Sequence, residues 1–171
     1  MITESFPWLN RIRTILQRDS SLVLLLSVIL LILFLIHGIG TCRDDVLVFH
    51  RYASYMMAGQ VPYLDFEVEF PPGAIVTYLI PALATTDLEG YCTVFAAFMT
   101  LCTLGTAYVG LRICDRTGVD KIAFAVLYII LVSTFYCHLV EKFDMAPVFL
   151  TALAILLHMS GKQKLAYCAS P

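Results

Sequence analysis

Residues 20–40 read SSLVLLLSVILLILFLIHGIG, and this uncharged stretch decides the fold class. A helix needs about 20 mainly apolar residues to cross the hydrocarbon core of a bilayer, and the stretch is long enough to do so. Hydrophobic residues make up 60% of the whole chain and charged residues 14%, whereas a typical soluble domain has about 45–50% and about 25%. The sequence therefore predicts an all-α integral membrane protein.

The stretch 20–40 could instead be a signal peptide, but its surroundings favour a retained helix. It follows a polar leader, residues 1–19, and lacks the small-residue cleavage pattern of secretory signals. Three later apolar runs predict further spans, and the last of them is short enough to need flanking side chains that snorkel to the interface. The membrane domain is expected over residues 20–160, with spans at about 20–40, 90–111, 122–140 and 145–160.

The segment 73–86 (GAIVTYLIPALATT) is apolar but short, and Pro81 interrupts its middle. Charge distribution decides its placement, because cytoplasmic loops carry an excess of Lys and Arg. If the N-terminus is cytoplasmic and the segment does not span, eight basic residues lie inside and three outside; if it spans, the counts become four and seven. We therefore expect about four spans in the plasma membrane, a cytoplasmic leader and tail (161–171), and an outer loop (41–89) that contains 73–86 as a re-entrant or interfacial segment.

The outer loop begins with a predicted amphipathic helix in DDVLVFHRYASYMMAG, residues 44–59. Asp44 or Asp45 suits its N-cap, and Gly59 is a typical stop. Its apolar residues recur at intervals of three and four, the period of one helix face: Val46, Phe49, Ala53 and Met56. We interpret this segment as an interfacial helix lying at the membrane surface.

The loop continues with GQVPYLDFEVEFPPG, residues 59–73, in which acidic and apolar residues alternate. Side chains of an extended chain alternate between two faces. The carboxylates of Asp65, Glu67 and Glu69 are therefore expected on one face, opposite Phe66, Val68 and Phe70. The prolines that follow disfavour helix at the residues before them. The pattern predicts a stiff, extended segment with one polar face.

The cysteines and the net charge exclude other classes of protein. The six cysteines lie mostly in or beside apolar runs without metal-ligand spacing. We interpret them as small apolar residues of the membrane helices rather than as a disulfide framework. A formal net charge of −2 gives no reason to expect nucleic acid as a partner.

Two motifs of the outer loop have a defined spacing: Asp45-x3-Phe49-x2-Tyr52-Ala53, then Gly59-x2-Pro62-Tyr63-x-Asp65-Phe66-x2-Glu69-Phe70-Pro71-Pro72-Gly73. Together they resemble the first outer loop of GT-C glycosyltransferases, and most closely that of the polyprenyl-phosphate-mannose-dependent mannosyltransferases. Phe49 and Phe70 stand where that family usually has tyrosine. The later EKFDMAP (141–147) resembles the family's second outer loop, in which an acid precedes the fourth helix. The resemblance covers about residues 44–161.

The resemblance implies a reaction on the outer face. Such enzymes transfer a sugar, here mannose-like, from a polyprenyl-phosphate donor to a hydroxyl of a glycan, lipid or protein acceptor, with inversion at the anomeric carbon. A one-step transfer needs a general base to take the acceptor's proton. Asp45 matches the carboxylate that has this role in the family. Asp44 is the neighbouring candidate, and Asp45 could also be only an N-cap.

The resemblance also implies secondary site residues. Asp144 is the second acid, placed to hold a divalent metal ion or to orient the acceptor, or it is an ordinary solvated charge. Asp65 and Glu69 are expected to shape the loop or contact sugar hydroxyls, with Tyr63 beside them. Arg51 is expected at the donor phosphate or at lipid head groups, since guanidinium matches phosphate oxygens. No cofactor other than that metal is expected.

Two other functions remain as alternatives. A non-catalytic membrane scaffold or assembly subunit could retain a degenerate loop of this kind. A small transporter is disfavoured because no ionisable residue falls in the middle of a predicted span. Members of the resembling class have more spans, so we expect this chain to be the N-terminal part of such an enzyme or to act with a second polypeptide that supplies them.

Overall fold

The computed structural model describes residues 19–40 and 44–170, and every regular element among them is a helix. The all-α prediction is therefore confirmed for this part of the chain. The helices are α2 (Asp19–His37), α3 (Asp44–Met57), α4 (Pro72–Ala82), α5 (Leu88–Thr117), α6 (Lys121–Glu141), α7 (Met145–Met159) and α8 (Gln163–Ala169).

Among the described residues, α5 and α6 are long and apolar enough to cross a membrane by length and composition. Three shorter apolar helical segments accompany them, at Ser21–His37, Pro72–Ala82 and Met145–Met159. The predicted spans at 20–40, 90–111, 122–140 and 145–160 correspond to α2, α5, α6 and α7. That all four cross a bilayer stays a prediction.

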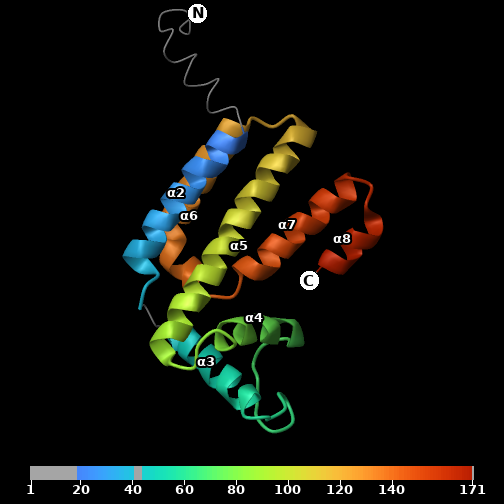
Figure 1. Cartoon of the computed structure of the whole chain (residues 1–171). Coiled ribbons are helices and arrows are strands. Elements are labelled where there is room, and N and C mark those ends of the chain that lie inside the picture. Colours follow the sequence, from blue (N-terminus) through green and yellow to red (C-terminus); the bar gives the residue numbers. More distant parts are fainter. Residues whose placement is uncertain (1–18, 41–43, 171) are drawn as a thin grey trace, which may run out of the picture.

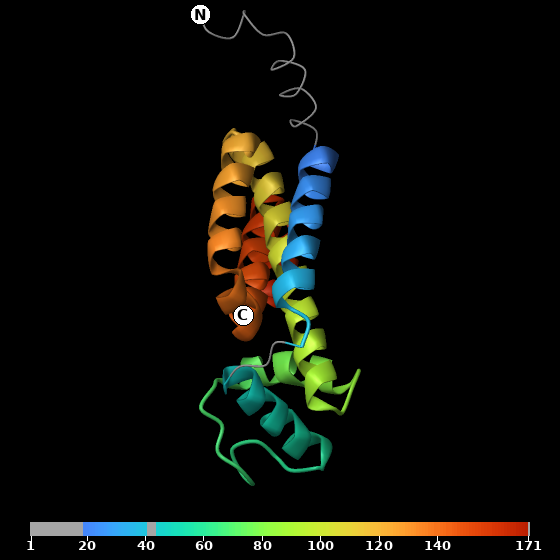
Figure 2. The same ribbon diagram turned by 90° about the vertical axis from the view of Figure 1, so that its left-hand side faces the viewer.

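The helices form a bundle with a second layer across one end (Figure 1). Helix α5 packs against α2, α6 and α7, while α3 and α4 pack on each other and on α5. The view turned by 90° shows α3 and α4 beyond the end of the bundle where α2 ends and α5 begins (Figure 2). The short segment 73–86 thus lies across the bundle end. Its helix α4 includes Pro81 and stops one residue later, so the proline ends the helix rather than breaking its middle.

Close packing between the long helices depends on glycines of α5. An added Cβ at Gly105 would lie 2.7 Å from the ring of Phe149 on α7, and one at Gly110 would overlap the ring of Phe124 on α6. Both positions therefore require the absence of a side chain, which lets an aromatic ring of the neighbouring helix rest on the α5 backbone. Helix α5 is the central element that fixes where the ends of α6 and α7 lie.

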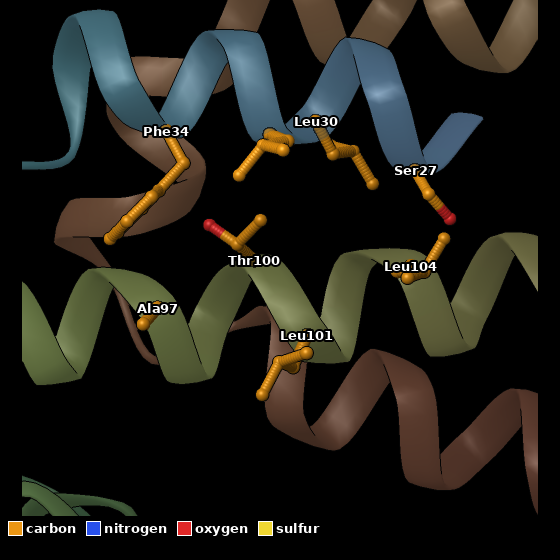
Figure 3. Close-up of a pocket in the computed structure, with 8 residues that line it drawn as sticks. Ser27, Leu30, Phe34, Ala97, Thr100, Leu101 and Leu104 are labelled. Carbon is orange, nitrogen blue, oxygen red and sulfur yellow. The ribbon is translucent and has the colours of Figure 1, made fainter. Parts of the chain in front are cut away.

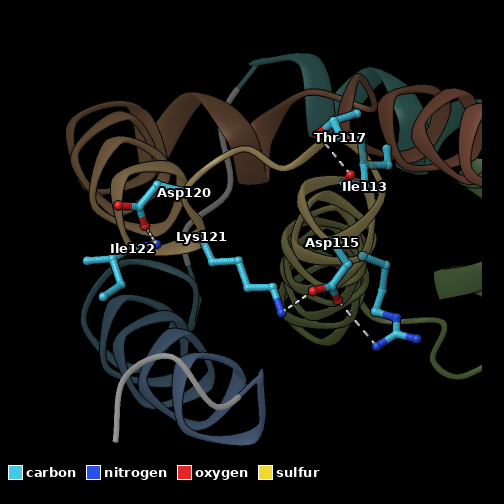
Figure 4. A network of polar contacts seen from close by, with 7 residues as sticks. Ile113, Asp115, Thr117, Asp120, Lys121 and Ile122 are labelled. Atoms are coloured by element: carbon cyan, nitrogen blue, oxygen red, sulfur yellow. Dashed lines mark hydrogen bonds and ion pairs between the residues drawn. The ribbon is translucent and has the colours of Figure 1, made fainter. Parts of the chain in front are cut away.

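The far end of the bundle is fixed by charges and caps. Helix α5 extends beyond the predicted end at residue 111 and stops at Gly118, which has the left-handed conformation of a C-cap (φ 75°). Asp115 pairs there with Arg112 and with Lys121, the first residue of α6 (Figure 4). The Asp120 carboxylate accepts a hydrogen bond from the backbone N–H of Ile122 at 2.8 Å and caps α6.

Two features differ from the sequence prediction. Cys92 at the start of α5 is disulfide-bonded, whereas Cys102, Cys114, Cys137 and Cys168 are free. The interpretation of all six cysteines as plain apolar residues is therefore wrong for Cys92, because a covalent pairing depends on tertiary proximity and not on local composition. The predicted tail also contains a helix, α8, which packs back on α7.

Candidate functional site

Helix α3 presents one face to the core and its first turn to the bundle end. Val46, Phe49 and Ala53 are buried, as the spacing predicts, and Tyr52 joins them. The helix begins at Asp44, so Asp45 lies inside the first turn rather than at the N-cap position before it. An acid in the first turn is stabilised by the positive end of the helix dipole. The Asp45 carboxylate keeps 37% of its side-chain surface exposed.

Lys142 joins α3 to the corner between α6 and α7. Its ammonium donates a hydrogen bond to Asp45 Oδ2, forming an ion pair between residues far apart in the chain. The Lys142 side chain is 49% exposed, so water reaches both partners. The pKa of Lys142 is raised, first by its hydrogen bond to Asp45 and then by the negative charges of Asp45, Asp144 and Glu141. The lysine is therefore a stably charged cation among acids.

Asp144 lies on the same corner, directly before α7. Its side chain is exposed, and its backbone carbonyl accepts a hydrogen bond from the N–H of Val148 at 3.1 Å. Asp45 and Asp144, both predicted from sequence as the acids of the site, are thus near one cation. Among the described residues no three or more His, Cys, Asp or Glu side chains gather as a metal site. The cation that these two acids share in the structure is the Lys142 ammonium.

A cluster of aromatic rings, Phe49, Phe70, Tyr78 and Phe143, lies beneath this pair. The ring of Tyr78 on α4 stacks on that of Phe49 with centroids 4.4 Å apart, and Phe70 and Phe143 meet it edge-on at 5.9 Å. Such stacked and edge-to-face pairs stabilise a fixed arrangement of rings. The Tyr78 hydroxyl is buried and has no hydrogen-bond partner among the described residues. Burial raises the pKa of Tyr78, with the nearby phenols and Asp45 adding to the effect.

The acidic stretch 59–73 is ordered by its own hydrogen bonds. The Asp65 carboxylate accepts from the N–H of Val61 at 2.7 Å, and the Tyr63 hydroxyl donates to the carbonyl of Phe70 at 2.5 Å. Tyr63 has φ 66°, a left-handed conformation that is uncommon for residues other than glycine. The predicted alternation is confirmed: Asp65, Glu67 and Glu69 are exposed, and Phe66, Val68 and Phe70 pack against the core. The prediction of an extended chain is wrong at residues 63–65, which form a turn in which the backbone N–H of Asp65 donates to the carbonyl of Val61 at 2.9 Å.

The end of this stretch lines an apolar cavity of about 460 Å³ between α4 and α7. Its walls come from the Pro-Pro-Gly turn, the first turns of α4 and α7, and Phe143, the residue after Lys142. They are Pro71, Gly73, Ala74, Thr77, Phe143, Ala146, Pro147 and Leu150. Phe143, which lines the cavity, lies between Lys142 and Asp144 in the chain. The cavity therefore offers an apolar surface next to this charged corner.

A second groove lies away from these charges, between α2 and α5 (Figure 3). It has a volume of about 270 Å³ and is lined mainly by apolar side chains. The hydroxyl of Thr100 is already bonded to the carbonyl of Ala96 and to the hydroxyl of Tyr136, both at 2.7 Å. This groove therefore presents apolar surface and no group suited to catalysis.

The remaining sequence candidates lie apart from the ion pair. Arg51 is exposed on α3, with its guanidinium 6.0 Å from the ring centre of its neighbour Tyr52. Glu69 is exposed on the polar face of the stretch, and Tyr63 and Asp65 make the loop bonds described above. The structure pairs Asp45 with Lys142, whose charge is also influenced by Asp144, and leaves Arg51 with a ring contact on its own helix.

Sequence reasoning missed Lys142 as a member of the site. The signal was present, since Lys142 is the single base within EKFDMAP and has acids on both sides. No family model, curated protein or solved structure matches the chain.

Proposed function

We propose that this chain is a membrane glycosyltransferase of the GT-C class, or the N-terminal part of one, that uses a polyprenyl-phosphate sugar as donor. The observation that carries the proposal is the position of Asp45. Its carboxylate lies at the end of the bundle and pairs with Lys142, and the next residue, Phe143, lines an apolar cavity whose wall includes the Pro-Pro-Gly turn. A base, a second acid and an apolar binding surface are the parts that transfer from a lipid donor requires.

The membrane arrangement we propose has four spans, α2, α5, α6 and α7, with α3 and α4 at the outer surface. The excess of basic residues on the opposite side supports this orientation. The disulfide at Cys92 supports it independently, because disulfides persist in oxidising compartments and are rare in the cytosol. Cys92 lies at the end of α5 that adjoins α3 and α4, which supports an extracytoplasmic position for this end.

The proposed reaction is a single inverting displacement. The acceptor hydroxyl oxygen attacks the anomeric carbon of the donor and forms the new glycosidic bond. The bond between that carbon and the phosphate oxygen breaks, its electron pair stays on the oxygen, and the lipid phosphate leaves. The acceptor's proton passes to the Asp45 carboxylate and then to solvent. Asp144 orients the acceptor, and the cavity between α4 and α7 holds the first part of the lipid chain.

The test is transfer of labelled sugar from polyprenyl-phosphate donors to added acceptors in proteoliposomes. The chain is assayed alone and together with any polypeptide that supplies further spans. We expect an inverted glycosidic product that disappears when Asp45 is changed to Asn. Absence of transfer with every donor, in a preparation where the chain and its partner are folded, would reject the proposal.

One observation favours a non-catalytic scaffold as the second candidate. The Asp45 carboxylate forms an ion pair with Lys142 and so links α3 to the corner between α6 and α7. A purely structural subunit could use the same ion pair to hold these elements together. The two proposals differ in their response to Asp45→Asn. A scaffold loses assembly with its partner, whereas the enzyme keeps assembly and loses transfer.

A further inference from the structure

The ion pair places Asp45 in a state that is unsuited to the role of a base. A carboxylate oxygen that accepts a hydrogen bond from an ammonium has that donor in the place where a substrate hydroxyl would have to approach. In the structure Lys142 makes this contact to Asp45. An acceptor hydroxyl that arrived now would meet a carboxylate already engaged with a cation. Catalysis by Asp45 therefore requires that Lys142 first moves away.

The Lys142 side chain can move without unfolding of α6 or α7. The residue follows the end of α6 in extended backbone, and about half of its side chain is exposed. Its four-carbon stem can swing the ammonium to a new partner while the backbone stays in place. Exposed ion pairs are weak, because water screens them and holding two side chains costs entropy. A ligand with a modest preference for the open state is sufficient to shift such an equilibrium.

The surroundings of Lys142 determine what kind of ligand can open the pair. Asp45 on α3, Glu141 on α6 and Asp144 before α7 all act on the ammonium as negative charges. A neutral ligand offers the ammonium no alternative to these acids. A phosphate does so, because lysine binds phosphate as a point charge. Phe143, adjacent to Lys142, lines the cavity between α4 and α7, so an apolar chain held there would bring an attached phosphate towards the ammonium.

We propose that Lys142 is an electrostatic latch on Asp45 that is opened by the phosphate of an amphiphile whose chain occupies this cavity. The inference rests on the proposed function, because it assigns an order to that reaction. The lipid phosphate binds first and draws the ammonium away. The freed carboxylate oxygen is then open to accept a hydrogen bond from the acceptor hydroxyl. The acceptor binds second.

The latch is tested without any sugar transfer, by zero-length crosslinking of the full chain in lipid nanodiscs. A water-soluble carbodiimide activates a carboxylate, and a lysine in contact with it forms an amide while the carbodiimide takes up the water as a urea. We expect an Asp45–Lys142 crosslink in the free protein, identified by mass spectrometry. Polyprenyl phosphate should lower its yield about fivefold, the factor that the loss of one exposed charge pair gives. Polyprenol, which has the same chain and no phosphate, should leave it unchanged.

Matched controls make the result specific to this pair. The variants Asp45→Asn and Lys142→Met should each abolish the crosslink and leave the Asp115–Lys121 crosslink at the other end of the bundle intact. That second pair should also not respond to either lipid. Binding of both lipids is measured separately with radiolabelled material that co-purifies with the nanodiscs.

Two results would overturn the latch. One is the absence of an Asp45–Lys142 crosslink in the free protein. The other is a yield that responds equally to bound polyprenyl phosphate and bound polyprenol, or to neither. The outcome is distinct from that of the transfer assay. If polyprenyl phosphate alone lowers the crosslink yield and no sugar is transferred, the latch stands and the proposed transfer is rejected. If sugar is transferred while the crosslink yield stays unchanged, the transfer stands and the latch is rejected.

Discussion

Replacing Asp45 with Asn separates the chemistry of this position from its structure. The change keeps the size of the side chain and removes the negative charge. Both Asp45 and its partner Lys142 are more than a third exposed, so the ion pair contributes less than about 1 kcal/mol to stability. Asn also loses the interaction of the carboxylate with the helix dipole, which is worth about 0.3–1 kcal/mol at an exposed first turn. We therefore expect normal membrane insertion and a thermal midpoint close to that of the wild type.

Transfer should respond very differently from stability. A general base beside the attacking hydroxyl contributes about 10²–10⁴-fold to the rate, so Asp45→Asn should lower kcat by that factor. The assay is single-turnover transfer of labelled sugar in proteoliposomes that contain the chain and any partner supplying further spans. Two matched variants, Asp44→Asn and Asp144→Asn, are measured beside it. Asp44→Asn should have a much smaller effect, because that position falls outside the aromatic spacing of the motif.

The contrast among the three acids decides the assignment of the base. Near-normal transfer by Asp45→Asn, together with its loss in Asp44→Asn or Asp144→Asn, would show that the base has been assigned to the wrong residue. Near-normal transfer by all three variants would show that the mechanism implied by the resemblance does not apply. A large drop in the thermal midpoint of Asp45→Asn would instead refute the low stability assigned to the exposed ion pair.

Four further predictions concern topology, order and stability. In a background without free cysteines, a membrane-impermeant thiol reagent added outside should label a cysteine placed at Glu67 and miss one at Arg116; labelling of both from outside contradicts the proposed orientation. Limited proteolysis of right-side-out membranes should leave residues 45–72 uncut, since that stretch is internally hydrogen-bonded, and rapid cleavage would indicate a mobile connector. In detergent thermal unfolding, Tyr78→Phe should be neutral or slightly stabilising because it removes a buried hydroxyl without a partner among the described residues, whereas Tyr78→Ala should cost about 3–5 kcal/mol; equal losses would mean that the hydroxyl is bonded. Hydrogen bonds from Thr85 and from the backbone N–H of Gly90 lower the pKa of Asp87. The charged Asp87 carboxylate should therefore stabilise the fold fully above the ordinary carboxyl pKa, and this stabilisation should be lost as pH falls through the lowered pKa. The difference in thermal midpoint between the wild type and Asp87→Ala should accordingly shrink in acid, and a difference independent of pH would contradict this assignment.

Features that depend on neighbouring residues could be predicted from the sequence. The spacing of Val46, Phe49 and Ala53 gave the buried face of α3, because a helix repeats its faces every three to four residues. The alternation in residues 65–70 gave the exposed carboxylates and the packed apolar side chains. The length and composition of the apolar runs gave the positions of the bundle helices. Each of these patterns is encoded within one or two turns of chain.

Features that depend on distant residues could not be predicted in this way. Asp45 and Lys142 meet because α5 and α6 return the chain to the end where α3 begins. The disulfide at Cys92 and the place of Tyr78 in the aromatic cluster depend on the same tertiary arrangement. Helix α8 was missed because its seven residues carry too little periodicity to stand out. No local pattern contains the information that two particular segments come into contact.

The weakness of the Asp45–Lys142 pair is itself an argument about its purpose. Stability alone gives little reason for an exposed pair, because water screens it and a salt-bridged side chain loses freedom. The aromatic rings of Phe49, Tyr78 and Phe143 already hold α3, α4 and the start of α7 together without it. A contact that adds little to the fold but occupies the carboxylate proposed as the base is better explained by reversible use. The same exposure that makes the pair weak allows a phosphate to reach Lys142 and an acceptor hydroxyl to reach Asp45.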